Sequence, residues 1–244
     1  MDFKKILFGA VIVIVLYIFY TSVFADKSKN DLVTMHDGMK NELRINSEKL
    51  SVSRSVNYTY SFWIYINDYN KFYGNEKVIL KRSATQGKET VFPKISLGEN
   101  QNDMHFKVTT GQTSATTTDH EIVVNNIPLQ KWNHIVMTKS GNTIDIYIDG
   151  KLVKTSILSN TASSVVDADI IITPKPEGAG ASGDYGFAGY LSKVNYFPNA
   201  INTREAYQLY KEGYGSGMLG DFFNRFKLKF AFLQDNQEKS SIIL

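Results

Sequence analysis

The chain has 244 residues, a formal net charge of +3 and no cysteine. A charge this small argues against a nucleic-acid-binding protein, which concentrates basic residues on one face. The absence of cysteine excludes disulfide scaffolds, thiol nucleophiles and cysteine-ligated metal sites, and the four histidines share no metal-ligand spacing such as HExxH.

Residues 6–24 form a long apolar run without a charged residue, ILFGAVIVIVLYIFYTSVF. At ~1.5 Å per residue, a helix of this length spans about 28 Å, enough to cross a bilayer core. Two lysines precede the run, which favours an N-terminus on the cytoplasmic side. A cleaved signal peptide is the alternative, because Val23 and Ala25 resemble a cleavage pattern, but the run exceeds the usual apolar length of about 7–15 residues. We therefore expect residues 1–25 to be a single-pass transmembrane anchor.

Residues 26–42 are polar with mixed charge and predict a stalk or a short helix beside the membrane. From residue 43 onward, short β runs alternate with turn residues. In YSFWIYIN (60–67), aromatic and aliphatic side chains on one face alternate with Ser61, Trp63 and Tyr65 on the other. Because both faces are largely apolar, this strand is expected inside a sheet rather than at its edge.

The segment KWNHIVMTKSGNTIDIYIDGKLV (131–153) has the pattern of a meander. A strand at 133–139 is followed by a Ser-Gly-Asn turn and by a strand of alternating isoleucines. Asp149 and Gly150 then form the dipeptide favoured in a two-residue type I′ turn, from which residues 151–157 return.

Further strands are predicted at 121–125, 168–173 and 186–197, with a Gly- and Pro-rich loop at 174–186. One helix is predicted at 203–211, with Asn202 as its N-cap and Glu205 three residues later. Many short strands with a single helix are typical of a β-sandwich.

The C-terminal segment 216–244 contains LGDFFNRFKLKFAFL (219–233). As a strand, its phenylalanines alternate with Arg and Lys. As a helix, the apolar residues share one face, and the segment would be a basic amphipathic helix that touches a membrane or a partner. The alternation favours a last strand that completes the sandwich.

Four segments resemble the concanavalin A-like lectin/glucanase superfamily in its laminin-G-like branch: YSFWIYIN, KWNHIVMTKSGNTIDIYIDGKLV, GFAGYLSKVNYF (186–197) and INTREAYQLYKEGYG (201–215). The second has the family's Trp-x-His strand, a turn, a strand ending in Tyr-x-Asp-Gly and a return strand. The resemblance implies a jelly-roll sandwich of two antiparallel sheets over residues 43–215. The family includes lectins, glycoside hydrolases, calcium-dependent adhesion modules and structural spacers.

The order of anchor, stalk, domain and aromatic tail is also similar to that of membrane-anchored proteins of large DNA viruses of algae and protists. That likeness implies a place on the internal membrane of a virion, beneath the capsid.

The sequence carries no sign of catalysis. It lacks the Glu-x-Asp-x-(x)-Glu strand of the superfamily's glucanases, and GAGASG (178–183) is not followed by the helix that a dinucleotide site requires. Trp63, Trp132 and His134 lie in two-sided apolar strands, which predicts core packing rather than a sugar platform.

Glycan binding requires exposed aromatic rings with polar side chains beside them. Two loops offer such residues: Asp68, Tyr69, Asn70, Phe72 and Tyr73 in the first, and Asp184 and Tyr185 in the second. The resemblance also implies calcium at one rim, for which Asp103 and Asp119 are candidate ligands, although the chain has no dense acidic cluster. Ordinary solvated loops are the alternative interpretation for each set.

The sequence therefore favours a non-enzymatic, membrane-anchored interaction module of a virion, without a cofactor unless calcium binds, whose partners are capsid proteins, membrane proteins or glycans. A lectin is the alternative, and a hydrolase with unrecognised carboxylates is the third hypothesis. A lectin predicts exposed aromatic residues beside Asp or Asn at one rim. A structural module predicts an exposed apolar patch or an unpaired edge strand.

Overall fold

The structure is a computed structural model that describes residues 31–50, 56–86, 88–111, 117–160, 168–174, 186–215, 229–234 and 237–243. The run 6–24 lies outside these residues. Within them, no helix has the length and apolar character needed to cross a membrane.

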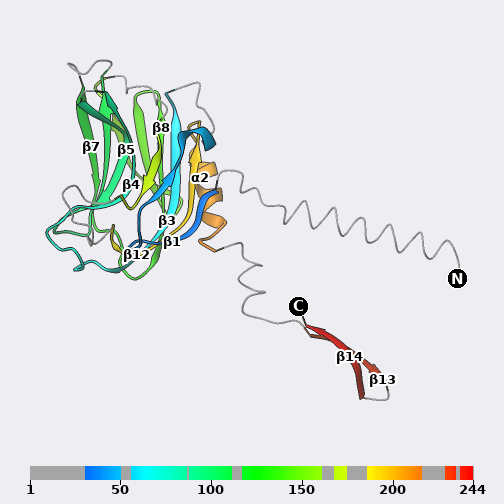
Figure 1. Cartoon of the computed structure of the whole chain (residues 1–244). Coiled ribbons are helices and arrows are strands. Elements are labelled where there is room, and N and C mark those ends of the chain that lie inside the picture. The colour runs from blue at the N-terminus through cyan, green and yellow to red at the C-terminus, as the bar shows by residue number, and fades with distance from the viewer. Residues whose placement is uncertain are drawn as a thin grey trace, which may run out of the picture. The chain divides into compact units, whose positions relative to one another are not determined.

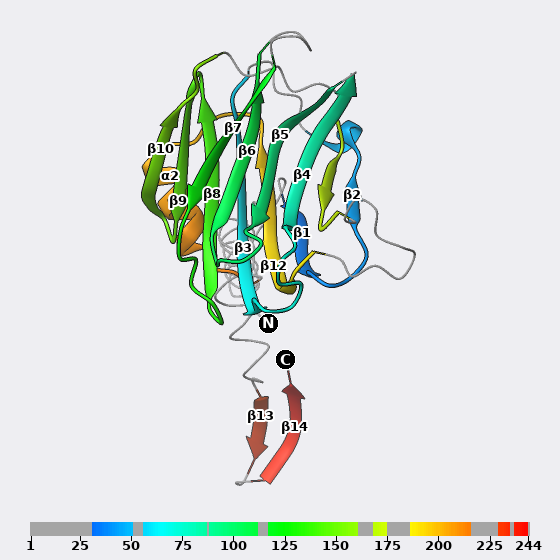
Figure 2. The same ribbon diagram turned by 90° about the vertical axis from the view of Figure 1, so that its left-hand side faces the viewer.

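Two six-stranded sheets pack face to face, and Figure 1 shows them edge-on as two layers. Sheet A has the order β1 (Asp31–Asp37), β12 (Ala188–Phe197), β3 (Tyr58–Asp68), β8 (Trp132–Ser140), β9 (Thr143–Ile148) and β10 (Lys151–Ile157). Sheet B has the order β2 (Leu43–Ile45), β11 (Ile170–Ile172), β4 (Lys77–Gln86), β5 (Lys88–Leu97), β6 (Met104–Thr110) and β7 (Thr118–Val124), and it faces the viewer in Figure 2.

Neighbouring strands pair antiparallel from β12 to β10 in sheet A and throughout sheet B. A short 3-10 helix (Ser47–Lys49) follows β2. The prediction of an all-β sandwich of two antiparallel sheets is confirmed.

The core lies between the sheets and follows the period-2 pattern of the strands. In β3, Tyr60, Phe62 and Ile64 are fully buried in this core, while Ser61 and Trp63 point to the other side of sheet A. β3 pairs with β12 on one side and β8 on the other, as its two-sided apolar pattern predicts.

The single described α-helix, α2 (Thr203–Lys211), covers the outer face of sheet A (Figure 1). The side chain of Asn202 accepts from the N–H of Glu205, whose carboxylate accepts from the N–H of Asn202. This capping box fixes the helix start as predicted. Gly213 has a φ of +71° just after the helix end.

The hairpin between β9 and β10 turns at Asp149 and Gly150, whose φ angles of +49° and +73° are those a type I′ turn requires. A Cβ at position 150 would lie 2.9 Å from the ring of Tyr207 and 3.1 Å from the Cβ of Tyr210. The glycine therefore serves both the turn and the close approach of α2.

Two predictions of organisation differ from the structure. Residues 31–37, which we predicted as part of a stalk, form the edge strand β1 and pair with β12. In the tail, Lys229–Gln234 (β13) is a strand as predicted, but it does not complete the sandwich. It pairs with Gln237–Ile243 (β14) in a separate two-stranded sheet, because the residues that follow it directly provide an antiparallel partner.

Candidate functional site

A hollow of about 640 Å³ lies at one end of the sandwich. Three loops form it: one joins β3 to β4, one joins β5 to β6, and one joins β7 to β8, and all three lie at the lower end of the sandwich in Figure 2. All but one of its lining residues carry a polar side-chain group; they are Asn67, Asp68, Tyr69, Asn70, Tyr73, Asn100, Gln101, Asn102, Asp103, Asn126, Leu129 and Gln130.

The chemistry of this lining suits a polyhydroxylated ligand. Side-chain amides both donate and accept hydrogen bonds, and carboxylates accept them from hydroxyl groups. Tyr73 is 60% exposed, so its ring is free to stack on an apolar ligand face. The hollow thus combines an exposed ring with convergent polar groups, as small-molecule sites do.

Hydrogen bonds hold the three loops together. The N–H of Gly74 donates to the carbonyl of Glu99 at 3.0 Å, which joins the first loop to the second. Asn102 and Ile127 join the second to the third, since the N–H of Ile127 donates to the carbonyl of Asn102 and Nδ2 of Asn102 donates back to the carbonyl of Ile127 at 3.0 Å. The hollow is therefore preformed.

Two buried side chains lie beneath the hollow. Tyr69 is only 9% exposed, and its hydroxyl donates to the carbonyls of Gly98 and Gln101. The ammonium of Lys77 lies 4.4 Å from the centre of the Tyr69 ring and donates to the carbonyls of Asn75, Gly98 and Glu99. Burial lowers the pKa of Lys77. These two residues hold the loops in position through their contacts with backbone carbonyls.

Backbone strain gathers in the same loops. Phe72, Asn126 and Gln130 have φ angles of +64°, +60° and +53°, in the left-handed region that non-glycine residues rarely adopt. Such residues cluster at ligand sites, where the surrounding structure holds them in place.

The structure brings five of the predicted site residues together: Asp68, Tyr69, Asn70, Tyr73 and Asp103 all line the hollow. Tyr69, however, points inward and offers no ring for stacking. Phe72 is half-buried and does not line the hollow, and the Lys71 ammonium lies 5.2 Å from the centre of its ring. Asp184 and Tyr185 lie outside the described residues.

The two candidate calcium ligands do not meet. Asp103 precedes β6, whereas Asp119 is opposite Thr109 near the other end of β6, about 20 Å away at ~3.3 Å per residue. Asp119 forms an ion pair with Lys107 at 2.8 Å and accepts from the Thr109 hydroxyl. Among the described residues, no three acidic or histidine side chains are grouped so as to hold a metal ion.

Sequence reasoning missed the residues that complete the hollow, together with the supporting Lys77: Asn67, Asn100, Gln101, Asn102, Asn126, Leu129 and Gln130. Their signal is the density of amides in the segments ENQND and NNIPLQ.

A second aromatic cluster lies on the outer face of sheet A, beneath and beside α2. The ring centroid of Trp63 is 4.9 Å from that of His134 and 5.6 Å from that of Tyr210, and Trp132 stacks on Tyr214 at 4.8 Å. Trp63 and His134 are buried, which confirms that they pack internally, although under the helix rather than between the sheets. Burial lowers the pKa of His134 to about 4.

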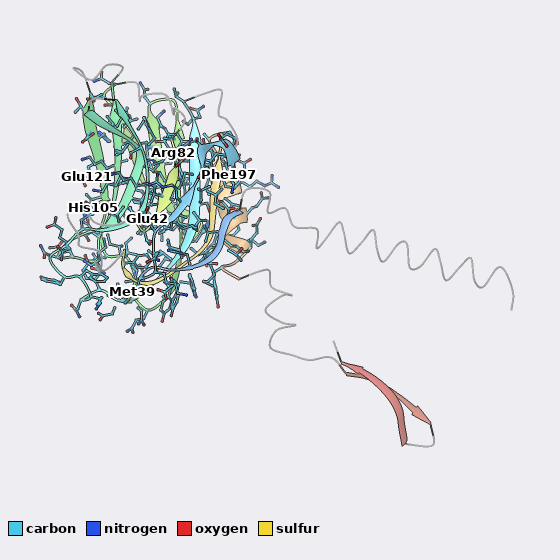
Figure 3. The ribbon with its side chains drawn as sticks, viewed as in Figure 1. Met39, Glu42, Arg82, His105, Glu121 and Phe197 are labelled. Carbon is cyan, nitrogen blue, oxygen red and sulfur yellow. The ribbon has the colours of Figure 1, made fainter. Side chains whose placement is uncertain are left out.

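Two carboxylates on the outer face of sheet B lie beside basic side chains. Glu76 contacts Lys94 at 2.5 Å, and Glu121 lies 3.0 Å from His105, a pair that Figure 3 places on the side facing away from sheet A. The pKa of Glu76 lies below its usual value because the lowering effects of Lys94 and Ser96 outweigh the raising effect of burial. A glycosidase acid needs the opposite shift.

Comparison with known proteins identifies the family to which this fold belongs. The Laminin_G_3 family, described as the concanavalin A-like lectin/glucanases superfamily, matches residues 37–206, well over half of the chain. The chain belongs to this superfamily. The match begins within the segment predicted as a stalk, consistent with the position of β1 in sheet A.

Among solved structures, the receptor-binding domain of botulinum neurotoxin D superposes with a TM-score of 0.54 at 16% identity, over 72% of this chain and 43% of that one. The serotype D ligand-binding domain in complex with N-acetylneuraminic acid gives 0.54 at 14% identity, over 73% and 42%. The binding domain of Paraclostridial Mosquitocidal Protein 1 gives 0.50 at 16% identity, over 74% and 46%.

At these identities the similarity establishes the fold alone, and this chain spans less than half of each of those chains. No curated protein sequence matches.

Proposed function

We propose that this member of the superfamily is a non-enzymatic lectin that binds glycans in the hollow at the end of its sandwich. The observation that carries the proposal is the lining itself, in which amides and carboxylates from three loops converge beside the exposed ring of Tyr73. The superfamily includes lectins, and one structural relative was solved with a bound sialic acid, which supports a glycan as the class of ligand.

The absence of catalysis is part of the proposal. Hydrolysis needs one carboxyl group with a raised pKa near a second, ionised one. On the outer face of sheet B, the pKa of Glu76 is lowered by Lys94 and Ser96, so this carboxylate is not suited to act as a general acid.

The membrane placement is also a proposal. The run 6–24 would anchor the lectin in a membrane with the N-terminus on the cytoplasmic side, and the sandwich would follow on the other side. In the narrower form of this proposal, the membrane is the internal membrane of a virion.

A glycan array tests the lectin proposal, using the full chain in a mild detergent with calcium and again with a chelator. We expect saturable binding that persists in chelator, because Asp103 and Asp119 lie at opposite ends of β6. Tyr73→Ala should weaken it by about tenfold, the effect of losing one stacking contact. Tyr207→Ala removes another exposed tyrosine, on α2, and should leave binding unchanged. Equal binding by wild type and Tyr73→Ala would overturn the proposed site.

One observation favours a second candidate function, a structural contact with neighbouring capsid or membrane proteins. Leu152, Val153 and Ile157 are 48%, 47% and 75% exposed on the edge strand β10. Such apolar exposure on an edge strand is typical of a protein-contact surface. If this contact exists, Ile157→Ser should abolish co-purification of the chain with membrane-bounded virus particles, and unchanged co-purification would contradict it.

A further inference from the structure

We infer that the hollow selects neutral glycans and rejects anionic ones, such as sialylated, sulfated or uronic acid-containing sugars. The inference rests on the proposed lectin function and names the class of its ligand. It follows from the charges that line the hollow and from the directions in which the neighbouring cations point.

Two carboxylates and no basic side chain line the hollow. The Oδ1 of Asp68 accepts from the N–H of Asn70 at 2.9 Å, and the Oδ1 of Asp103 accepts from the N–H of Asn126 at 3.2 Å. Within the described part of the chain, the Oδ2 of each carboxylate has no hydrogen-bond partner. These oxygens can accept from sugar hydroxyls and would repel a ligand carboxylate or sulfate.

The basic residues nearest in sequence are directed elsewhere. The ammonium of Lys71 lies over the Phe72 ring, and that of Lys131 forms an ion pair with Asp149 at 2.8 Å. Lys77 is buried beneath Tyr69, where it donates to three backbone carbonyls. None of the three presents a donor to a ligand anion in the hollow.

The remaining lining groups suit a neutral sugar. The amides of Asn67, Asn70, Asn100 and Gln130 supply donors and acceptors in similar numbers, which matches hydroxyl and N-acetyl groups. Tyr73 supplies the ring on which an uncharged sugar face stacks. Carboxylates provide the strongest acceptors for hydroxyl donors, because a charged acceptor strengthens a hydrogen bond.

The test compares matched glycan pairs that differ by one anionic group, each neutral oligosaccharide with its sialylated form, on the full chain in detergent. We expect neutral glycans to bind at least about tenfold more tightly, given like charges a few ångströms apart. The double variant Asp68→Asn/Asp103→Asn keeps both Oδ1 acceptors and removes both charges, so it should bind sialylated glycans more tightly than wild type does. Glu48→Gln, at an exposed carboxylate outside the hollow, is the matched control and should change nothing.

The outcomes separate the two proposals. Neutral binding with a gain of sialylated binding in the double variant supports the inference. Sialylated glycans bound as tightly as neutral ones, with both lost in Tyr73→Ala, would overturn the inference and leave the lectin intact. Glycan binding that is absent, or unaffected by Tyr73→Ala, would overturn the lectin proposal and the inference with it.

Discussion

Two groups of aromatic and polar side chains in this protein have similar residue types in the sequence but differ in their exposure to solvent. One lines the hollow at the end of the sandwich, where Tyr73 is exposed beside amides and carboxylates. The other, on the outer face of sheet A, is covered by α2, which packs Tyr210 over Trp63 and His134. Residue type alone does not make a sugar platform. What decides is whether another element covers the ring.

The two groups should also differ in their contributions to stability and to ligand affinity. We expect the buried cluster under α2 to stabilise the fold, and the exposed residues of the hollow to contribute little to stability. Changes in the two regions should therefore separate stability from affinity.

The largest effect is expected from Trp63→Ala. The side chain is 6% exposed and contacts His134, Tyr210 and Tyr214, so its removal leaves a cavity that costs about 3–5 kcal/mol of unfolding free energy. Urea denaturation followed by circular dichroism measures this loss. A cost below about 1 kcal/mol would show that the cluster is not a stabilising core.

Acid should weaken the same cluster. The folded-state pKa of His134 is about 4, lowered chiefly by burial from 6.5, with Asp149 opposing that shift. Between about pH 6.5 and 4, the unfolded chain therefore binds more protons at His134 than the folded chain does. The contribution of neutral His134 to the unfolding free energy is complete above about pH 6.5 and is lost as the pH falls toward 4. The loss should reach about 3 kcal/mol. His134→Phe cannot titrate, and its stability should show a smaller pH dependence; an unchanged profile would contradict the assignment.

Lys77→Met should lower both the stability of the fold and the affinity for glycans. The substitution keeps the apolar stem and removes the ammonium that joins Asn75, Gly98 and Glu99, at a cost of about 1–3 kcal/mol. Glycan affinity should also fall, because the loops of the hollow loosen. Lys139→Met is the matched control: this buried lysine bonds the carbonyls of Val56 and Gly141 at the other end of β8, so its loss should cost similar stability and no affinity.

The smallest effect on stability is expected from Tyr73→Ala. An exposed loop residue of this kind changes the unfolding free energy by about 0.5 kcal/mol or less. Urea denaturation of the variant measures the change directly. A loss of 2 kcal/mol or more would mean that Tyr73 supports the loop, and the distinction between the two regions would fail.

The sequence predicts the parts of the fold that have a strong local signal. Alternation in β3, Asp149-Gly150 in the hairpin and the Asn202–Glu205 capping box each specify their element locally. The edge strand β1 gives a weak pattern: Val33 is buried, whereas Met35 is 55% exposed, so a polar stalk was the natural expectation.

The site was only partly predictable because its loops come from three separated segments. Each loop has a recognisable polar composition, yet loops have no periodicity to show which side chain points inward. The sequence therefore does not distinguish Tyr69 from Tyr73, although Tyr69 is buried beneath the hollow and Tyr73 is exposed. Asp103 lies in the hollow beside Asp68, whereas Asp119 lies near the other end of β6. This placement depends on how the strands pair, which the loop sequences do not show.

The most direct test of the central claim is a nuclear magnetic resonance titration of the labelled full chain in detergent with a neutral oligosaccharide that the array identifies. The account predicts shifts in the side-chain amide signals of the hollow, such as those of Asn70, Asn100 and Gln130, and none in the indole N–H signals of the two tryptophans under and beside α2. Shifts in the indole signals with unchanged amides would place the binding site at the α2 cluster and contradict the account.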